Sequence, residues 1–186
     1  MRKTYSVFPL AAMLLCALGQ SQSADTPIRM EEIPAFHVIG KLGKGTSSDK
    51  DKWIPPLWAA LGGGSAEILP HILKNAAGFP RGLWAIMSDM DETFAPWDER
   101  GGKYLAGFET DGSTPPPSGW VKWRVPGYRY LVARTTISAY GETFDAVMRQ
   151  YLPEHGLALA GAVHERYPDP ENPDIIELLF PLERLP

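Results

Sequence analysis

Residues 120–135 decide the fold, and they read Trp120-Val-Lys-Trp-Arg-Val125-Pro-Gly-Tyr128-Arg-Tyr-Leu-Val-Ala-Arg-Thr135. The residues on both sides of Pro126-Gly127 are strand-like, since aromatic and β-branched side chains favour extended backbone. The Pro-Gly pair itself is a turn signal. The stretch therefore predicts a bent strand, with one arm over 120–125 and the other over 128–135.

The segment after this strand predicts a helix followed by two more strands. Apolar side chains recur at helical spacing along one face, with Ser138 as the expected cap and Pro153 and Gly156 as the end. Residues 157–164 and 175–182 then read as strands. The apolar residues of the helix are Tyr140, Phe144, Val147, Met148 and Tyr151.

The first half of the chain shows the same order of elements. Residues 30–42 alternate as a strand does, Pro55-Pro56 can open a helix that Gly62-Gly63-Gly64 ends, and strands are expected over 83–87 and 104–109. A proline-rich linker, 114–119, separates the halves. We therefore predict an α+β fold of two β-α-β-β repeats, about 28–112 and 119–185, with helices packed on an antiparallel sheet.

Composition narrows the functional classes. The 186 residues suit one domain, and 44% hydrophobic against 22% charged residues is ordinary for a globular protein. The formal net charge of −4 and the lack of a Lys/Arg cluster argue against a nucleic-acid partner. No nucleophile motif or metal-binding spacing is present, and the four His are dispersed. We expect no metal and no cofactor.

The N-terminus has the order of a secretory signal peptide. A positive start at Arg2 and Lys3 precedes the apolar run 7–18, and small and polar residues follow. The run is shorter than the roughly 20 residues of a membrane span. We predict that residues 1–23 are removed, that no transmembrane segment is left, and that the protein is periplasmic or secreted. The remaining chain has 16 basic and 22 acidic residues and no cysteine.

Several segments together resemble the gyrase-inhibitor-like small-molecule-binding family, which includes effector-binding domains of AraC-type and multidrug-responsive bacterial regulators. Their order and spacing over residues 28–185 carry the resemblance. It implies two repeats related by a pseudo-twofold axis, with a ligand cleft between them that is lined with aromatics and holds a buried carboxylate. The segments are Tyr104-Leu-Ala-Gly-Phe-Glu109, Val125-Pro-Gly-Tyr-Arg-Tyr130, Glu142-Thr-Phe144, Leu152-Pro-Glu-His-Gly156, Glu165-Arg-Tyr167 and Ile176-Glu-Leu-Leu-Phe-Pro-Leu182.

Glu177 is the candidate for that carboxylate. It interrupts the apolar run 175–180, and a strand that is apolar on both sides is buried on both faces of a sheet. A carboxylate there must be paired, protonated or reserved for a ligand. Three readings stay open: a ligand-binding group, an ion pair with Arg134 or Arg166, or an edge position that faces water.

Other candidate ligand-binding residues are aromatic or acidic. Trp97 lies in an acidic loop, where its ring could hold a cation or could anchor the loop onto the core. Glu109 ends a strand and either faces solvent or joins the cleft. Tyr104, Trp123 and Tyr130 could form the walls of the cleft.

These features predict an exported protein that binds a small apolar or cationic compound. The resemblance also implies two alternatives. Some relatives hydrolyse reactive cyclopropane-bearing compounds, which would give Glu177 the role of activating water beside a substrate-stacking tryptophan. A haem-binding family shares a similar duplicated fold, with His37 or His164 as candidate axial ligands.

Overall fold

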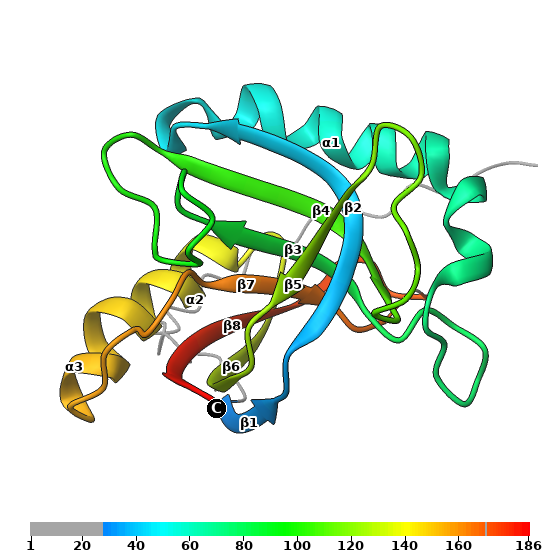
Figure 1. The fold of residues 1–186 in the computed structure, drawn as a ribbon. Helices are drawn as coiled ribbons and strands as arrows, with labels where there is room; N and C mark the ends of the chain where they lie inside the picture. Colours follow the sequence, from blue (N-terminus) through cyan, green and yellow to red (C-terminus); the bar gives the residue numbers. More distant parts are fainter. Residues whose placement is uncertain (1–27, 170) are drawn as a thin grey trace, which may run out of the picture.

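The computed structural model describes residues 28–169 and 171–186, so the predicted signal peptide lies outside the described residues. The described chain forms one eight-stranded antiparallel sheet with helices (Figure 1). The strands are β1 (Ile28–Ile33), β2 (Phe36–Gly45), β3 (Leu83–Ser88), β4 (Gly102–Thr110), β5 (Val121–Val125), β6 (Tyr128–Thr136), β7 (His164–Tyr167) and β8 (Ile175–Arg184). The helices are α1 (Lys50–Gly64), α2 (Tyr140–Ala146) and α3 (Leu152–Glu154), a π-helical turn joins the last two (Val147–Tyr151), and short 3-10 turns span Ser47–Asp49, Ser65–Glu67 and Leu69–His71.

The order of the strands shows a duplication. It runs β1-β6-β8-β7-β3-β4-β2-β5. Strands β1 to β4 of the first half correspond in turn to β5 to β8 of the second half. When each strand is replaced by its counterpart, the same order results, read in reverse. The sheet therefore has pseudo-twofold symmetry about the central β3–β7 pair, and the predicted α+β fold is confirmed. Each repeat also lends its first strand to the other repeat, since β1 pairs with β6 and β5 pairs with β2.

Proline positions explain where the predicted strands divide. The bent strand is present as β5 and β6, and Pro126-Gly127 separates them. The expected single strand over 30–42 is wrong, because the chain breaks between β1 and β2 at Pro34-Ala35. The two breaks are symmetry-related, and Ile33 faces Tyr128 across them. A proline supplies no N–H for the sheet. At each of these two breaks, the chain can therefore leave one part of the sheet and join another.

Two helix predictions need correction. α1 begins at Lys50, so Pro55 and Pro56 lie inside the helix instead of opening it, and the glycines 62–64 form its last turn. Packing of its aromatic side chains against the sheet outweighs the missing helical hydrogen bonds. The helix expected over 140–151 becomes π-helical after Ala146. The expected strand over 157–164 is also wrong, since β7 begins only at His164.

Side chains of the sheet alternate between two faces. One face is covered by α1 and by α2, and we call it the helix face; Figure 1 shows α1 running along β2 and β4. The opposite face carries a core drawn from both repeats, which we call the central core. It consists of Phe36, Val38, Trp84, Ile86, Phe94, Leu105, Trp123, Val125, Tyr128, Tyr130, Val132 and Leu179.

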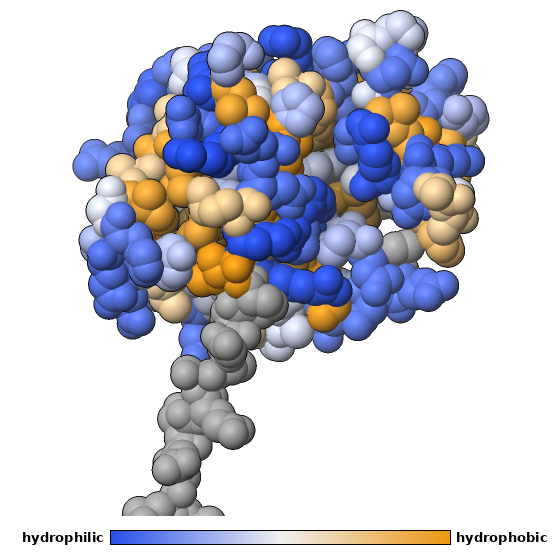
Figure 2. Space-filling model, turned by 90° about the horizontal axis from the view of Figure 1, so that it is seen from below, coloured by the Kyte–Doolittle hydropathy of each residue, from blue (hydrophilic) through white to orange (hydrophobic). Residues whose placement is uncertain are grey.

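Few large apolar side chains reach the surface. On the face that Figure 2 shows, hydrophobic residues form small patches between hydrophilic ones, as is usual for a globular surface. No helix in the described ranges is long and apolar enough to cross a membrane. The exposed large hydrophobic residues among those described are Met30, Leu69, Phe79 and Ile137.

Candidate functional site

The site is a cavity on the helix face, between α1, α2 and the sheet. Its volume is about 850 Å³, which is within the range of small-molecule sites in proteins. Both repeats contribute to its wall: the first supplies α1, Met87 and Tyr104, and the second supplies α2 and β7. The predicted cleft between the repeats is therefore present in the structure as a cavity.

A buried carboxylate, Glu165, lies in this wall on β7. Its side chain is only slightly accessible, with 7% of the residue exposed. Two phenol hydroxyls donate to the same oxygen, Oε2: Tyr104 at 3.1 Å and Tyr167 at 3.0 Å. Tyr104 comes from β4 and Tyr167 from β7 itself, so the sheet holds the carboxylate in place from two strands.

Aromatic rings surround this carboxylate. Trp58 of α1 donates from Nε1 to the hydroxyl of Tyr104 at 3.0 Å, and its ring packs edge-on against Tyr167 at 5.0 Å. Trp97 also lines the cavity and stacks on Trp53 of α1 at 5.7 Å. The wall is therefore apolar and electron-rich around one carboxyl group, an arrangement that attracts cations when that group is ionised.

The loop between β3 and β4 brings Trp97 to the cavity. Asp89 holds the start of this loop by accepting from the Thr93 N–H at 2.7 Å, and Phe94, with a φ of 66°, inserts its ring into the central core. A non-glycine residue with positive φ costs energy, which the buried ring offsets. Gly102 lets the Trp97 ring lie against the backbone, since a Cβ there would overlap the indole.

Burial controls the electrostatics of the site. Burial raises the pKa of Glu165, and hydrogen bonds from the tyrosines and the charge of Lys50 only partly counter it. Burial also raises the pKa of Tyr104, Tyr140 and Tyr167, and the nearby carboxylate of Glu165 raises them further. These phenols therefore stay protonated as donors, and the ionised carboxylate is held at an energetic cost.

The exposed rim of the cavity includes residues of α2 and of the start of α1. The rings of Tyr140 and Phe144 lie parallel, 6.1 Å apart, and Ile137 is half exposed beside them. Two exposed carboxylates, Asp51 and Asp145, lie at this rim. The rim thus combines aromatic side chains with an acidic edge.

The structure brings together only some of the residues predicted from sequence. Tyr104 and Trp97 line the cavity. Trp123 and Tyr130 belong to the central core on the other face of the sheet, so neither reaches it. Glu109 is at the end of β4 and does not face open solvent, because Arg81 donates to it from Nε at 3.1 Å.

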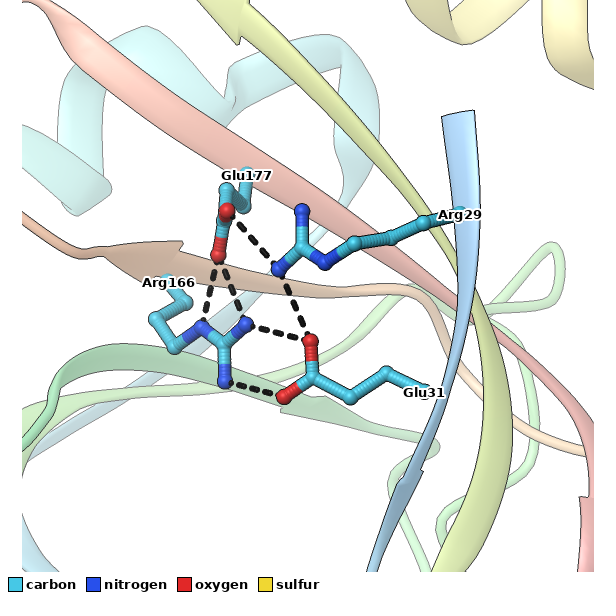
Figure 3. A network of polar contacts seen from close by, with 4 residues as sticks. All are labelled: Arg29, Glu31, Arg166 and Glu177. Atoms are coloured by element: carbon cyan, nitrogen blue, oxygen red, sulfur yellow. Dashed lines mark hydrogen bonds and ion pairs between the residues drawn. The ribbon is translucent and has the colours of Figure 1, made fainter. Parts of the chain in front are cut away.

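Glu177 is also on the opposite face from the cavity, in an ion network (Figure 3). Arg166 donates to it from Nε at 2.8 Å, and Arg29 approaches it at 2.9 Å. Arg166 also makes a two-pronged contact with Glu31, at 2.9 and 2.8 Å. Of the readings left open for Glu177, the ion pair with Arg166 is the one that the geometry shows. The network joins the edge strand β1 to β7 and β8.

The four histidines, all in the described part of the chain, do not line the cavity. Neither His37 nor His164 is among the residues that line it. His164 is fully buried, its Nδ1 accepts from the Met87 N–H at 3.3 Å, and burial lowers its pKa to about 3. Among the described residues, no three His, Cys, Asp or Glu side chains are grouped to hold a metal ion.

Sequence reasoning missed most of the residues that line the cavity, among them the four residues Glu165, Trp58, Tyr140 and Tyr167. Three of them lie in segments that did attract notice, the Glu165-Arg-Tyr167 motif and the amphipathic helix. The signal was present in β7, where Glu165 and Arg166 alternate in a half-buried strand and so must point to opposite faces. A four-residue strand is too short for its pattern to show which face is buried.

Solved structures share this fold. The protein SAV2435 bound to tetraphenylphosphonium is 15% identical, with a TM-score of 0.62, over 84% of this chain and 94% of that one. A putative transcription regulation protein from Staphylococcus aureus MU50 is 11% identical, with a TM-score of 0.59, over 85% and 99%. The C-terminal domain of EcmrR is 15% identical, with a TM-score of 0.57, over 87% and 99%. At these identities the likeness concerns the fold alone.

Comparison with curated proteins finds no match. A family model does match, and it covers residues 26–183, almost the whole of the described chain. It extends over both repeats and over all the elements that form the cavity. The chain therefore belongs to the family described as the GyrI-like small molecule binding domain.

Proposed function

We propose that this protein binds a small, largely apolar compound that carries a positive charge, and that the cavity on the helix face is its binding site. The observation that carries the proposal is the placement of Glu165, a buried carboxylate held by tyrosine hydroxyls in an aromatic wall. The tetraphenylphosphonium bound to SAV2435, a protein of the same fold, supports a ligand of this class.

The chemistry of the wall favours such a ligand for two reasons. A cation near Glu165 would supply the opposite charge that the buried carboxylate lacks, and so would remove much of its desolvation penalty. The faces of Trp58 and Trp97 would add attraction between the rings and the positive charge. The apolar body of the ligand would fill the space between α1 and α2.

Tryptophan emission offers a direct test. We expect tetraphenylphosphonium to change it saturably, because Trp58 and Trp97 line the cavity. Trp58→Phe and Trp97→Phe should each reduce the amplitude of the change. Trp123→Phe serves as the control, since Trp123 lies in the central core. A signal that never saturates, or that depends only on Trp123, would contradict the proposed site.

A hydrolase on the same cavity is the second candidate. The observation that favours it is the place of Glu165 in the cavity wall, where a carboxyl group whose pKa is raised by burial can serve as a general acid or base. In this proposal Glu165, not Glu177, would act on water or substrate. Incubation with a cyclopropane-bearing electrophile, followed by mass analysis of the products, separates turnover from binding.

Export is proposed on the N-terminal sequence alone. We expect the mature chain to begin between Gln20 and Asp25, because a positive start, an apolar run and small residues precede this point. Intact-mass measurement of the protein from the periplasm or medium of an expressing bacterium checks this. Exported protein that retains residues 1–19 would contradict it.

A further inference from the structure

Within residues 28–169 and 171–186, one basic residue, Lys50, lines the cavity, together with three acidic residues. The acidic ones are Glu165 in the sheet wall and Asp51 and Asp145 at the rim. Arg149 donates to Asp145 at 3.1 Å, so that carboxylate already has a partner. The cavity lining therefore carries more acidic than basic groups. For a cationic ligand, the carboxylates attract and the ammonium group of Lys50 repels.

Lys50 occupies an unfavourable place for a positive charge. It is the first residue of α1, and the N-terminus of a helix carries partial positive charge. The neighbouring Lys52 is compensated by Asp49, whose Oδ1 lies 2.5 Å from its ammonium nitrogen. In the described part of the chain, Lys50 takes part in no ion pair within 4 Å. Lys52 therefore has a local ion-pair partner, whereas Lys50 is exposed and keeps its full charge available at the cavity.

The charge of Lys50 acts on the carboxylate in the cavity. Its effect on Glu165 lowers the pKa of that carboxyl, against the larger raising effect of burial. Tyr104 and Tyr167 donate to Oε2 of Glu165 without bringing any charge. Among the described residues, Lys50 is consequently the basic side chain with which a charged ligand shares the cavity.

We infer that Lys50 sets the charge selectivity of the cavity, by weakening the binding of permanent cations relative to neutral or anionic compounds of the same shape. The inference rests on the proposed binding function of this cavity. A positive charge beside Glu165 is attracted by the carboxylate and repelled by Lys50. A neutral ligand feels neither force strongly, and an anion is repelled by Glu165 but attracted by Lys50 at the rim.

The test compares tetraphenylphosphonium with tetraphenylborate, which has nearly the same shape and the opposite charge. Lys50→Met should tighten binding of the phosphonium by about five- to tenfold. This is the gain expected when a like charge is removed from near the ligand in a site that is partly open to solvent. The same variant should not tighten binding of the borate. The gain should shrink in high salt, because an exposed charge is screened.

Lys52→Met is the matched control. It removes the same charge from the same helix, and Lys52 does not line the cavity. Its phosphonium affinity should stay within about twofold of wild type, since screening weakens the more distant charge. Thermal unfolding of both variants shows whether a substitution destabilises α1. A change in affinity without such destabilisation arises from the charge and not from the helix.

The outcomes distinguish the two proposals. If wild-type protein binds the phosphonium but Lys50→Met and Lys52→Met behave alike, the selectivity inference is overturned and the binding function stands. If Lys50→Met tightens both probes equally, the lysine acts by obstruction and the inference is also overturned. If neither probe binds wild type or any variant, the proposed function and the inference fall together.

Discussion

Replacing Glu177 with leucine should lower the free energy of unfolding by about 3 kcal/mol, the loss expected when one partner of a buried ion pair is removed. The side chain of Glu177 is only 5% exposed and that of Arg166 16%. Without Glu177, Arg166 keeps its contact with Glu31 but loses the partner that lies deeper in the protein. Urea titration of wild type and variant measures the change.

The double variant Arg166→Met/Glu177→Leu is the control for this prediction. With the guanidinium also removed, Glu31 loses Arg166 but keeps its ion pair with Arg29 at 2.8 Å, so no charge of the network is left unpaired and stability should recover by most of the loss. Phosphonium binding should be unchanged in Glu177→Leu, because Glu177 is on the opposite face from the cavity. Loss of binding with unchanged stability would restore Glu177 as a ligand-binding residue and contradict the geometry.

Replacing Glu165 with glutamine should weaken phosphonium binding by at least about 30-fold, since the buried carboxylate is the main opposite charge offered to the ligand. The amide keeps the shape and can still accept from Tyr104 and Tyr167. Glu142→Gln is the control, because Glu142 is an exposed carboxylate on α2 that does not line the cavity. Equal affinities for wild type and Glu165→Gln would rule out the proposed role of Glu165.

The same substitution should stabilise the protein at pH 8 by about 1–3 kcal/mol, the usual penalty for a buried polar group without full compensation. The sign follows from the pKa of Glu165, which burial raises in the folded state. Below the unfolded pKa both states are protonated, so wild type and variant should differ little at pH 4. As pH rises, the unfolded chain loses this proton more readily, and wild-type stability falls. Denaturant titrations at the two pH values measure the difference.

Much of the fold could be predicted from local sequence. The two halves repeat their order of elements, and the Pro126-Gly127 turn marks a break in extended chain that the structure contains between β5 and β6. Backbone restrictions of this kind act within a few residues, so they can be read along the chain. The expected cleft between two repeats was implied by the resemblance to the gyrase-inhibitor-like family.

Helix boundaries were less predictable because tertiary contacts override local preference. Prolines 55 and 56 predict the start of a helix, yet α1 begins at Lys50. Rings on this helix pack against Trp97 and against Tyr104 and Tyr167 of the sheet. These partners come from distant parts of the chain, and their packing extends the helix beyond the position that proline favours.

By itself, the sequence identified Glu177 as a carboxylate that interrupts an apolar strand, and it left a ligand-binding role, an ion pair and a water-facing edge position open. Only the tertiary structure decided which carboxylate faces the cavity. The register of β7 against β8 places Arg166 opposite Glu177, so these two pair on one face and Glu165 is turned to the other. Side chains alternate along a strand, and a shift of one residue would exchange the two faces. That register depends on contacts between residues far apart in sequence, which no local pattern contains.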